Sequence, residues 1–330
     1  MTATPATRTA WLQIHFCVLL WGFTAILGKL ITLPALPLVW WRMLLVAALL
    51  MLLPRVWRGL RAMPARLRWA YAGAGVLVAL HWLTFYAAIK LSNASVGATC
   101  MALATVFTAL VEPWMTGKRL SKREVGLGIA VLPGVALVAG GVPDGMLVGV
   151  AVGAVSALLV AIFGSLNKRL VEHADALSVT ALEMAAGVAA MTLLAPLSGL
   201  LSPAAFGGDP FLLPDLRDGL YLLGLAIACT LVPFVLSLMA LRHLSAFGAQ
   251  LAINLEPVYA IALAMLLLGE QRELTPTFYL GVAIILGTVL IYPLVVRPRR
   301  IEHPEALALT EAKVIGEAGE ASEADAPGPR

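Results

Sequence analysis

Long apolar runs separated by short charged connectors dominate the chain. Two runs carry a single charge each, Arg42 in 30–54 and Glu256 in 243–269. Eight runs of at least 19 residues contain no Asp, Glu, Lys or Arg: 9–28, 69–89, 91–111, 125–143, 145–167, 184–208, 219–241 and 274–296. A helix needs about 20 apolar residues to cross the hydrocarbon core, whereas barrel strands are about ten residues long and alternate in polarity. The pattern therefore predicts an all-α integral membrane protein with ten transmembrane helices.

The composition agrees with a membrane protein. The 330 residues are 60% hydrophobic and only 13% charged, whereas soluble domains are about half apolar and a quarter charged. This balance disfavours a soluble enzyme, a nucleic-acid binder, a disulfide scaffold and a disordered chain. The three cysteines lie in apolar runs without a CxxC spacing, so we interpret them as packing residues and expect no metal site and no cofactor.

The basic residues gather on alternate connectors. If the N-terminus is inside, the cytoplasmic connectors hold 16 of the 23 Lys and Arg residues and the outer ends hold four. The positive-inside rule then predicts cytoplasmic segments at 1–10 and at the C-terminus. The acidic tail 301–330 lacks apolar periodicity and is predicted to be a disordered cytoplasmic segment.

The two halves of the chain resemble each other weakly. Five runs precede the Pro143-Asp144 connector and five follow it, which predicts repeats at 11–140 and 145–296. The segment 103–107 (LATVF) aligns with 255–259 (LEPVY), and the same offset pairs Gly117 with Gly269. Because each repeat has an odd number of helices, the second enters the membrane inverted. Inverted repeats are typical of secondary transporters, whose substrate site lies near the midplane between the repeats.

Several short motifs resemble those of the drug/metabolite transporter superfamily, and within it the EamA type. They are Leu20-Trp21-Gly22, Arg42, Asn254-Leu255-Glu256-Pro257 and Leu268-Gly269-Glu270 followed by a glycine-containing last helix. The first half departs from the family pattern, because Lys118 stands where Glu is common and Thr105 where Pro is common. The resemblance implies a carrier of small metabolites, often an exporter in the bacterial inner membrane, and favours a monomer slightly. It does not identify the substrate.

Glu256 is the clearest candidate for a substrate-binding residue, because an ionisable group in hydrocarbon costs about 2.5–3.5 kcal/mol on insertion scales. Pro257 frees a backbone carbonyl near Ile253 and favours a kink there. Gln250 and Asn254 share a helix face and extend the polar patch. Glu256 either binds an amine or carries a proton in a cavity, or it is a protonated structural link between helices.

Aromatic and imidazole groups near the middle of their runs, and Arg42 in the outer third of its run, complete the candidate site. Trp21, His81, Trp82 and Tyr86 suit a pocket for a small amphipathic ligand, and the alternative for each is ordinary packing. His81 either couples to protons or is a neutral ring bonded to a backbone carbonyl. Arg42 either binds a substrate carboxylate or extends to the outer headgroups.

Other polar and small residues have structural interpretations. Glu183 is expected to pair with a basic neighbour, and Gly145, Gly149 and Gly153 to pack helices closely. Pro133 and Pro233 mark either hinges or tolerated kinks. We interpret the acidic cluster in the outer loop as a solvated connector; its members are Asp209, Asp215 and Asp218.

The sequence thus predicts a secondary active transporter that works by alternating access, with a small-molecule substrate, the lipid bilayer and possible protons as partners. It is predicted to act in efflux, with no nucleic-acid partner. The chain contains no Walker A, HExxH or GxSxG motif, so we expect neither an ATP-driven pump nor an enzyme. A membrane-embedded enzyme and a passive facilitator are the alternatives.

Overall fold

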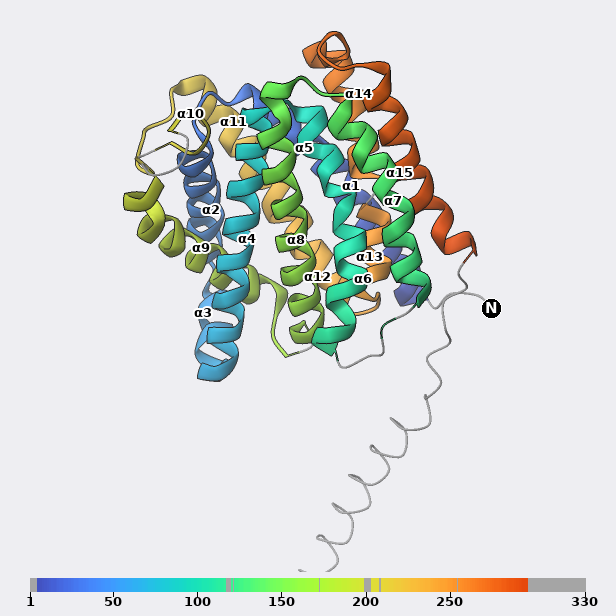
Figure 1. The fold of residues 1–330 in the computed structure, drawn as a ribbon. Helices are drawn as coiled ribbons and strands as arrows, with labels where there is room; N and C mark the ends of the chain where they lie inside the picture. Colours follow the sequence, from blue (N-terminus) through green and yellow to red (C-terminus); the bar gives the residue numbers. More distant parts are fainter. Residues whose placement is uncertain are drawn as a thin grey trace, which may run out of the picture. The chain divides into compact units, whose positions relative to one another are not determined.

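The computed structural model describes residues 5–116, 120, 122–171, 173–198, 203–207, 209–253 and 255–295. The tail 301–330, and Gly117 and Lys118 of the repeat comparison, lie outside these residues. Within the described ranges every regular element is a helix (Figure 1): α1 Pro5–Leu30, α2 Ala35–Met51, α3 Pro54–Ala62, α4 Ala65–Leu91, α5 Ala94–Met101, α6 Leu103–Thr116, α7 Lys122–Gly140, η1 Asp144–Met146, α8 Leu147–Leu170, α9 Ala176–Ser198, α10 Pro203–Phe206, α11 Leu216–Ala226, η2 Ile227–Leu231, α12 Val232–Leu241, α13 Ala246–Ile253, α14 Glu256–Leu263, η3 Ala264–Leu268, η4 Glu270–Arg272 and α15 Pro276–Val295. The chain divides into two units, Met1–Tyr292 and Pro293–Arg330, and the following description concerns the first.

By length and apolar composition, six helical stretches in the described residues can cross a membrane: Ala6–Leu30, Ala65–Leu91, Ala94–Met115, Asp144–Leu170, Ala176–Leu197 and Leu216–Leu241. The pair α2 and α3 gives a seventh if it is one span, although its two parts are bent by 93°. Three shorter apolar helices are Ile129–Gly140, Glu256–Leu268 and Pro276–Thr288. The predicted count of ten is therefore not established by helix length alone.

The two halves of the chain pack mainly against each other. Helix α4 of the first half contacts α8 and α9 of the second, and α1 contacts α12 and α14. Figure 1 shows α4 and α8 running side by side. The core between the halves is therefore formed by residues far apart in the sequence, and a site inside it draws on both halves.

Glycines permit the closest of these crossings. A Cβ added to Gly149 of α8 would lie 2.8 Å from Ser92 Cβ. A Cβ added to Gly153, one turn later, would lie 2.7 Å from Cys100 Sγ. These two glycines therefore pack helices as predicted. Gly145 differs, because it lies in η1 before α8 begins and a Cβ there would meet nothing within 4 Å.

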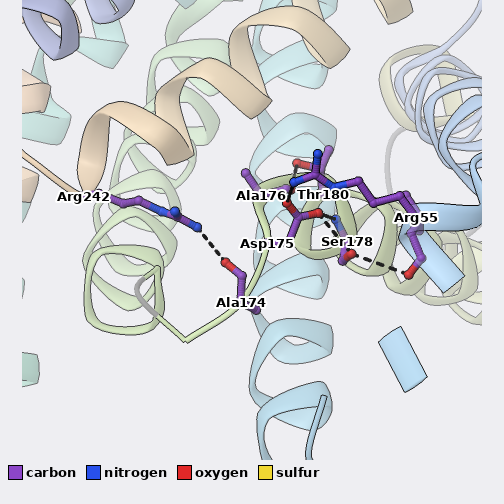
Figure 2. A network of polar contacts seen from close by, with 8 residues as sticks. Arg55, Ala174, Asp175, Ala176, Ser178, Thr180 and Arg242 are labelled. Carbon is purple, nitrogen blue, oxygen red and sulfur yellow. Dashed lines mark hydrogen bonds and ion pairs between the residues drawn. The ribbon is translucent and has the colours of Figure 1, made fainter. Parts of the chain in front are cut away.

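Helix α3 is a structured part of the connector between α2 and α4 that the sequence analysis left unassigned. Figure 2 shows how it docks onto the start of α9: Arg55 forms an ion pair with Asp175 at 2.8 Å, and the Ser178 hydroxyl donates to the Val56 carbonyl. Arg242, just after α12, donates to the Ala174 carbonyl at 2.8 Å. The Arg55–Asp175 pair is exposed, so it contributes at most about 1 kcal/mol.

Two buried acids connect chain segments that are far apart in the sequence, and the first of them is Asp218. Asp218 accepts hydrogen bonds from the backbone N–H groups of Thr32 and Leu33, at 2.9 and 3.2 Å, and from the Thr32 hydroxyl at 2.7 Å. Asp218 is 1% exposed, so the interpretation of this residue as part of a solvated connector is wrong. Its carboxylate is needed because the backbone between α1 and α2 presents donors that have no helical acceptor.

Glu270 has the same role at the start of α5. It accepts from the N–H groups of Ala94 and Ser95 at 2.9 and 2.8 Å and from the Ser95 hydroxyl at 2.7 Å. Gly269 before it has a φ of 71°, a left-handed conformation that glycine adopts without steric cost. This turn lets the Leu-Gly-Glu motif reverse the chain after η3 and deliver the carboxylate to α5.

We expect Gly75→Ala to destabilise the fold. A Cβ at Gly75 would lie 2.3 Å from the carbonyl oxygen and 2.6 Å from the Cα of Glu183, so α4 and α9 would have to separate at a cost of about 1–3 kcal/mol. The matched control is Gly73→Ala on the same helix, where nothing lies within 4 Å. Thermal unfolding in detergent should show a lower midpoint for the first variant only; equal shifts would contradict the close crossing.

Candidate functional site

A cavity of about 130 Å³ lies inside the first unit. Its walls come from both halves of the chain, with α1, α2, α4 and α6 on one side and α8, α12, α13 and α14 on the other. Aromatic side chains form much of the lining: Trp21, Trp82, Phe85, Phe163 and Phe234. The few polar groups among them include Arg42, His81, Asn167 and Glu256. An apolar wall with a few convergent polar groups is the usual form of a small-molecule site.

Arg42 is held rigidly at this cavity. Its Nε donates to the Thr230 hydroxyl at 2.6 Å, one terminal nitrogen donates to the Tyr86 hydroxyl at 2.6 Å, and the other donates to the Cys229 carbonyl at 3.2 Å. The guanidinium carbon also lies 3.7 Å from the centroid of the Trp82 ring, a cation–π distance. Arg42 is 1% exposed, so it points into the protein and does not extend to the outer headgroups.

The hydrogen bonds of Arg42 leave donors available. A guanidinium has five N–H groups, and three of them are used by the described partners. One N–H remains on each terminal nitrogen. Two N–H groups on one guanidinium can bind both oxygens of a carboxylate, so the arrangement suits an anionic group of a ligand.

Glu256 supplies the opposite charge at the same cavity. It lies close enough to Arg42 to interact with it electrostatically, and it is the first residue of α14. Helix α13 ends at Ile253, and Pro257 is the second residue of α14, so the interruption falls where the proline was expected to cause it. Glu256 lines the cavity at the start of α14.

His81 is held by Ser156, and its part in proton coupling stays a prediction. Its Nδ1 lies 2.8 Å from Ser156 Oγ and 3.1 Å from the Ser156 carbonyl, while the same hydroxyl donates to the His81 carbonyl at 2.9 Å. Because the single hydroxyl proton is used in that bond and a carbonyl oxygen only accepts, Nδ1 is the donor to Ser156. His81 is thus bonded to a backbone carbonyl and also lines the cavity.

The structure brings together five of the eight predicted site residues: Trp21, Arg42, His81, Trp82 and Glu256. Tyr86 does not line the cavity and is connected to it through its hydrogen bond with Arg42. The side chain of Gln250 and the whole of Asn254 lie outside the described residues, so their part in the site remains a prediction.

Sequence reasoning missed two groups that position Arg42 and several that form the wall. Thr230 lies in the π-helical turn η2 and donates to the Leu225 carbonyl at 2.7 Å while it accepts from Arg42. The Cys229 contact uses a backbone carbonyl, for which no side-chain pattern exists. The one available signal was a hydroxyl in the middle of the apolar run 219–241.

The comparisons with known proteins identify the family. The family model described as "EamA-like transporter family" matches the chain twice, over residues 9–140 and 147–293. A solved structure titled "Crystal structure of protein" has a TM-score of 0.62 and 17% sequence identity, covering 90% of this chain and 99% of the other. At that identity the likeness shows the fold alone. No curated protein matches the chain. The two matches of the family model together cover most of the sequence, and the chain therefore belongs to the EamA-like transporter family, whose members are membrane transporters of small molecules.

Proposed function

We propose that this chain is a secondary active transporter that exports amino acids or related small amphipathic molecules. The observation that carries the proposal is a pair of opposite charges in one cavity lined by aromatic rings, the buried Arg42 and the partly buried Glu256. In this proposal the two remaining donors of Arg42 bind a carboxylate, Glu256 binds an amine, and Trp21 and Trp82 contact the apolar part of the substrate.

The proposal includes alternating access around this cavity. Ten helices form two inverted five-helix repeats in the cell inner membrane, with both termini in the cytoplasm. The seven candidate spans and three shorter apolar helices add up to that number, and the distribution of basic residues supports the orientation. Because the cavity walls come from both halves, rocking one half against the other would expose the site to each side in turn.

The test is counterflow in proteoliposomes. We expect vesicles preloaded with an unlabelled amino acid to take up the same radiolabelled amino acid transiently and with saturation, whereas a cationic drug of similar size should not support exchange. Protein-free vesicles provide the control. Linear, unsaturable flux would identify a passive facilitator, and the absence of exchange for every amino acid tested would contradict the proposal.

A further inference from the structure

Glu183 is a buried acid that the substrate site does not use. It lies in α9, is 0% exposed, and neither carboxyl oxygen has a hydrogen-bond partner among the described residues. The basic partner expected from the sequence does not appear among those residues. An unpaired carboxylate in such a place costs several kcal/mol, so in this conformation the carboxyl group is most stable in its neutral, protonated form.

Among the residues that the structure describes, no positively charged group faces Glu183. Tyr71 of α4 is the titratable side chain that faces it. On the elements packed against α9, the other charged or titratable residues are engaged elsewhere or exposed: Arg42 at the cavity, His81 at Ser156, Lys90 at the Ile31 carbonyl, Arg55 at Asp175, and Arg58, Arg61, Arg66 and Arg68 at the surface. Helix α12 contains no charged residue, and Arg242 after it binds the Ala174 carbonyl.

One residue connects Glu183 to the substrate cavity. Asn167 of α8 interacts with the Glu183 carboxyl group without meeting the geometry of a hydrogen bond, and its Oδ1 also has no described partner. Asn167 lines the cavity. The carboxyl group is therefore separated from the cavity by a single amide side chain, which can rotate to exchange partners.

A second connection runs through the backbone. The close crossing at Gly75 places α4 directly against the backbone of Glu183, and the same helix carries His81 and Trp82 at the cavity wall. A shift of α4 during the transport cycle would therefore change the surroundings of Glu183.

The end of α9 gives a short route to water. Glu183 lies seven residues after Ala176, the first residue of α9, which is about 10 Å along the helix axis. Asp175 at that end is partly exposed, and the hydroxyl of Thr180, one turn further along α9, donates to the Ala176 carbonyl (Figure 2).

We propose that Glu183, with Asn167, is a proton-binding site that couples substrate movement to the pH gradient. The carboxylate takes one proton from water on one side of the membrane, crosses the conformational change as a neutral acid, and releases that proton to water on the other side. This inference rests on the proposed carrier function, and it assigns the proton to a group other than Glu256 and His81.

The experiment separates exchange from coupling. In proteoliposomes holding the amino acid that gives counterflow, a pH gradient of one unit should drive up to tenfold accumulation by the wild type for one proton per substrate. Glu183→Gln, which resembles the protonated acid in shape, should retain counterflow and lose the accumulation. Glu183→Asp, which keeps a carboxyl group, should show part of the accumulation of the wild type. The matched control is Glu112→Gln. Glu112 is another buried acid, on α6, but it has an interaction partner. This variant should accumulate substrate like the wild type.

Each result bears on one proposal. Accumulation that persists in Glu183→Gln, or a wild type that shows counterflow but no response to pH in either direction, would overturn the proton site and leave the carrier function standing. No counterflow by the wild type would overturn the carrier function itself. If Glu183→Gln fails to give a monodisperse protein, Glu183→Asp decides through the pH dependence of its accumulation, which should be shifted from that of the wild type.

Discussion

Replacing Arg42 with methionine should weaken substrate binding by about 30-fold to several thousand-fold. Removing one partner from a buried, hydrogen-bonded charge pair costs about 2–5 kcal/mol, and each 1.4 kcal/mol is tenfold in affinity. Methionine keeps an unbranched apolar stem that reaches to about the position of Nε, but it cannot bind a carboxylate. The measurement is the half-saturation concentration for counterflow.

Two further variants separate the charge of Arg42 from its geometry. Arg42→Lys keeps the charge but loses the planar fork, and we expect about a tenfold loss. Tyr86→Phe removes one hydrogen-bond acceptor of the charged guanidinium. A hydrogen bond to a charged group is worth about 1.5–3 kcal/mol, so half-saturation should change by at most about 150-fold. If Arg42→Met folds and saturates like the wild type, the substrate does not bind at Arg42.

Glu270→Ala should destabilise the protein by about 3 kcal/mol or more. The change leaves three hydrogen-bond donors of Ala94 and Ser95 without an acceptor. Water cannot easily replace the carboxylate, because Glu270 is only 1% exposed. Each buried donor that loses its acceptor costs about 1–3 kcal/mol. Denaturation in mixed micelles measures the loss. Hydrogen exchange at the Ala94 and Ser95 amides gives a local readout and should speed up strongly.

The same substitution three residues later provides the control. Glu273 is exposed and accepts one hydrogen bond, from the Asn93 side chain at 3.0 Å. Glu273→Ala should change stability by no more than about 0.5 kcal/mol. Equal losses in the two variants, or unchanged exchange at Ala94 and Ser95 in Glu270→Ala, would show that the buried carboxylate does not hold the start of α5.

Much of the site could be predicted because charge in an apolar run is rare. Arg42 and Glu256 are the single charges of their runs, and the cost of burying them made both candidates for function. Both were assigned to one candidate site, but the groups that hold Arg42 could not be predicted, since the sequence does not state which helix faces which. The same limit explains the missing basic partner of Glu183 and the unforeseen role of Thr230.

The buried acids Asp218 and Glu270 show a second reason why some contacts could not be predicted from the sequence. Asp218 lies in the first turn of α11, just after a segment that contains Pro and Gly, a composition typical of solvated connectors, and its partner Thr32 is 186 residues away. Glu270 likewise binds Ala94 at a separation of 176 residues. Helix α3 was predictable in principle, because Arg55, Arg58 and Arg61 repeat every three residues around the buried Val56, which is a helical spacing.

Glu183 has no countercharge in the described part of the chain, and this has a consequence for the energetics of transport. Arg42 and Glu256 stay with the protein, so a zwitterionic substrate adds no net charge to a cycle, and the proton on Glu183 would be the only charge that crosses. Exchange of one exported zwitterion for one entering proton would then be electrogenic. A membrane potential of 100 mV, negative inside, would add about 2.3 kcal/mol to the driving force, roughly a 50-fold gradient. Voltage alone would then drive export even where the pH on the two sides is equal.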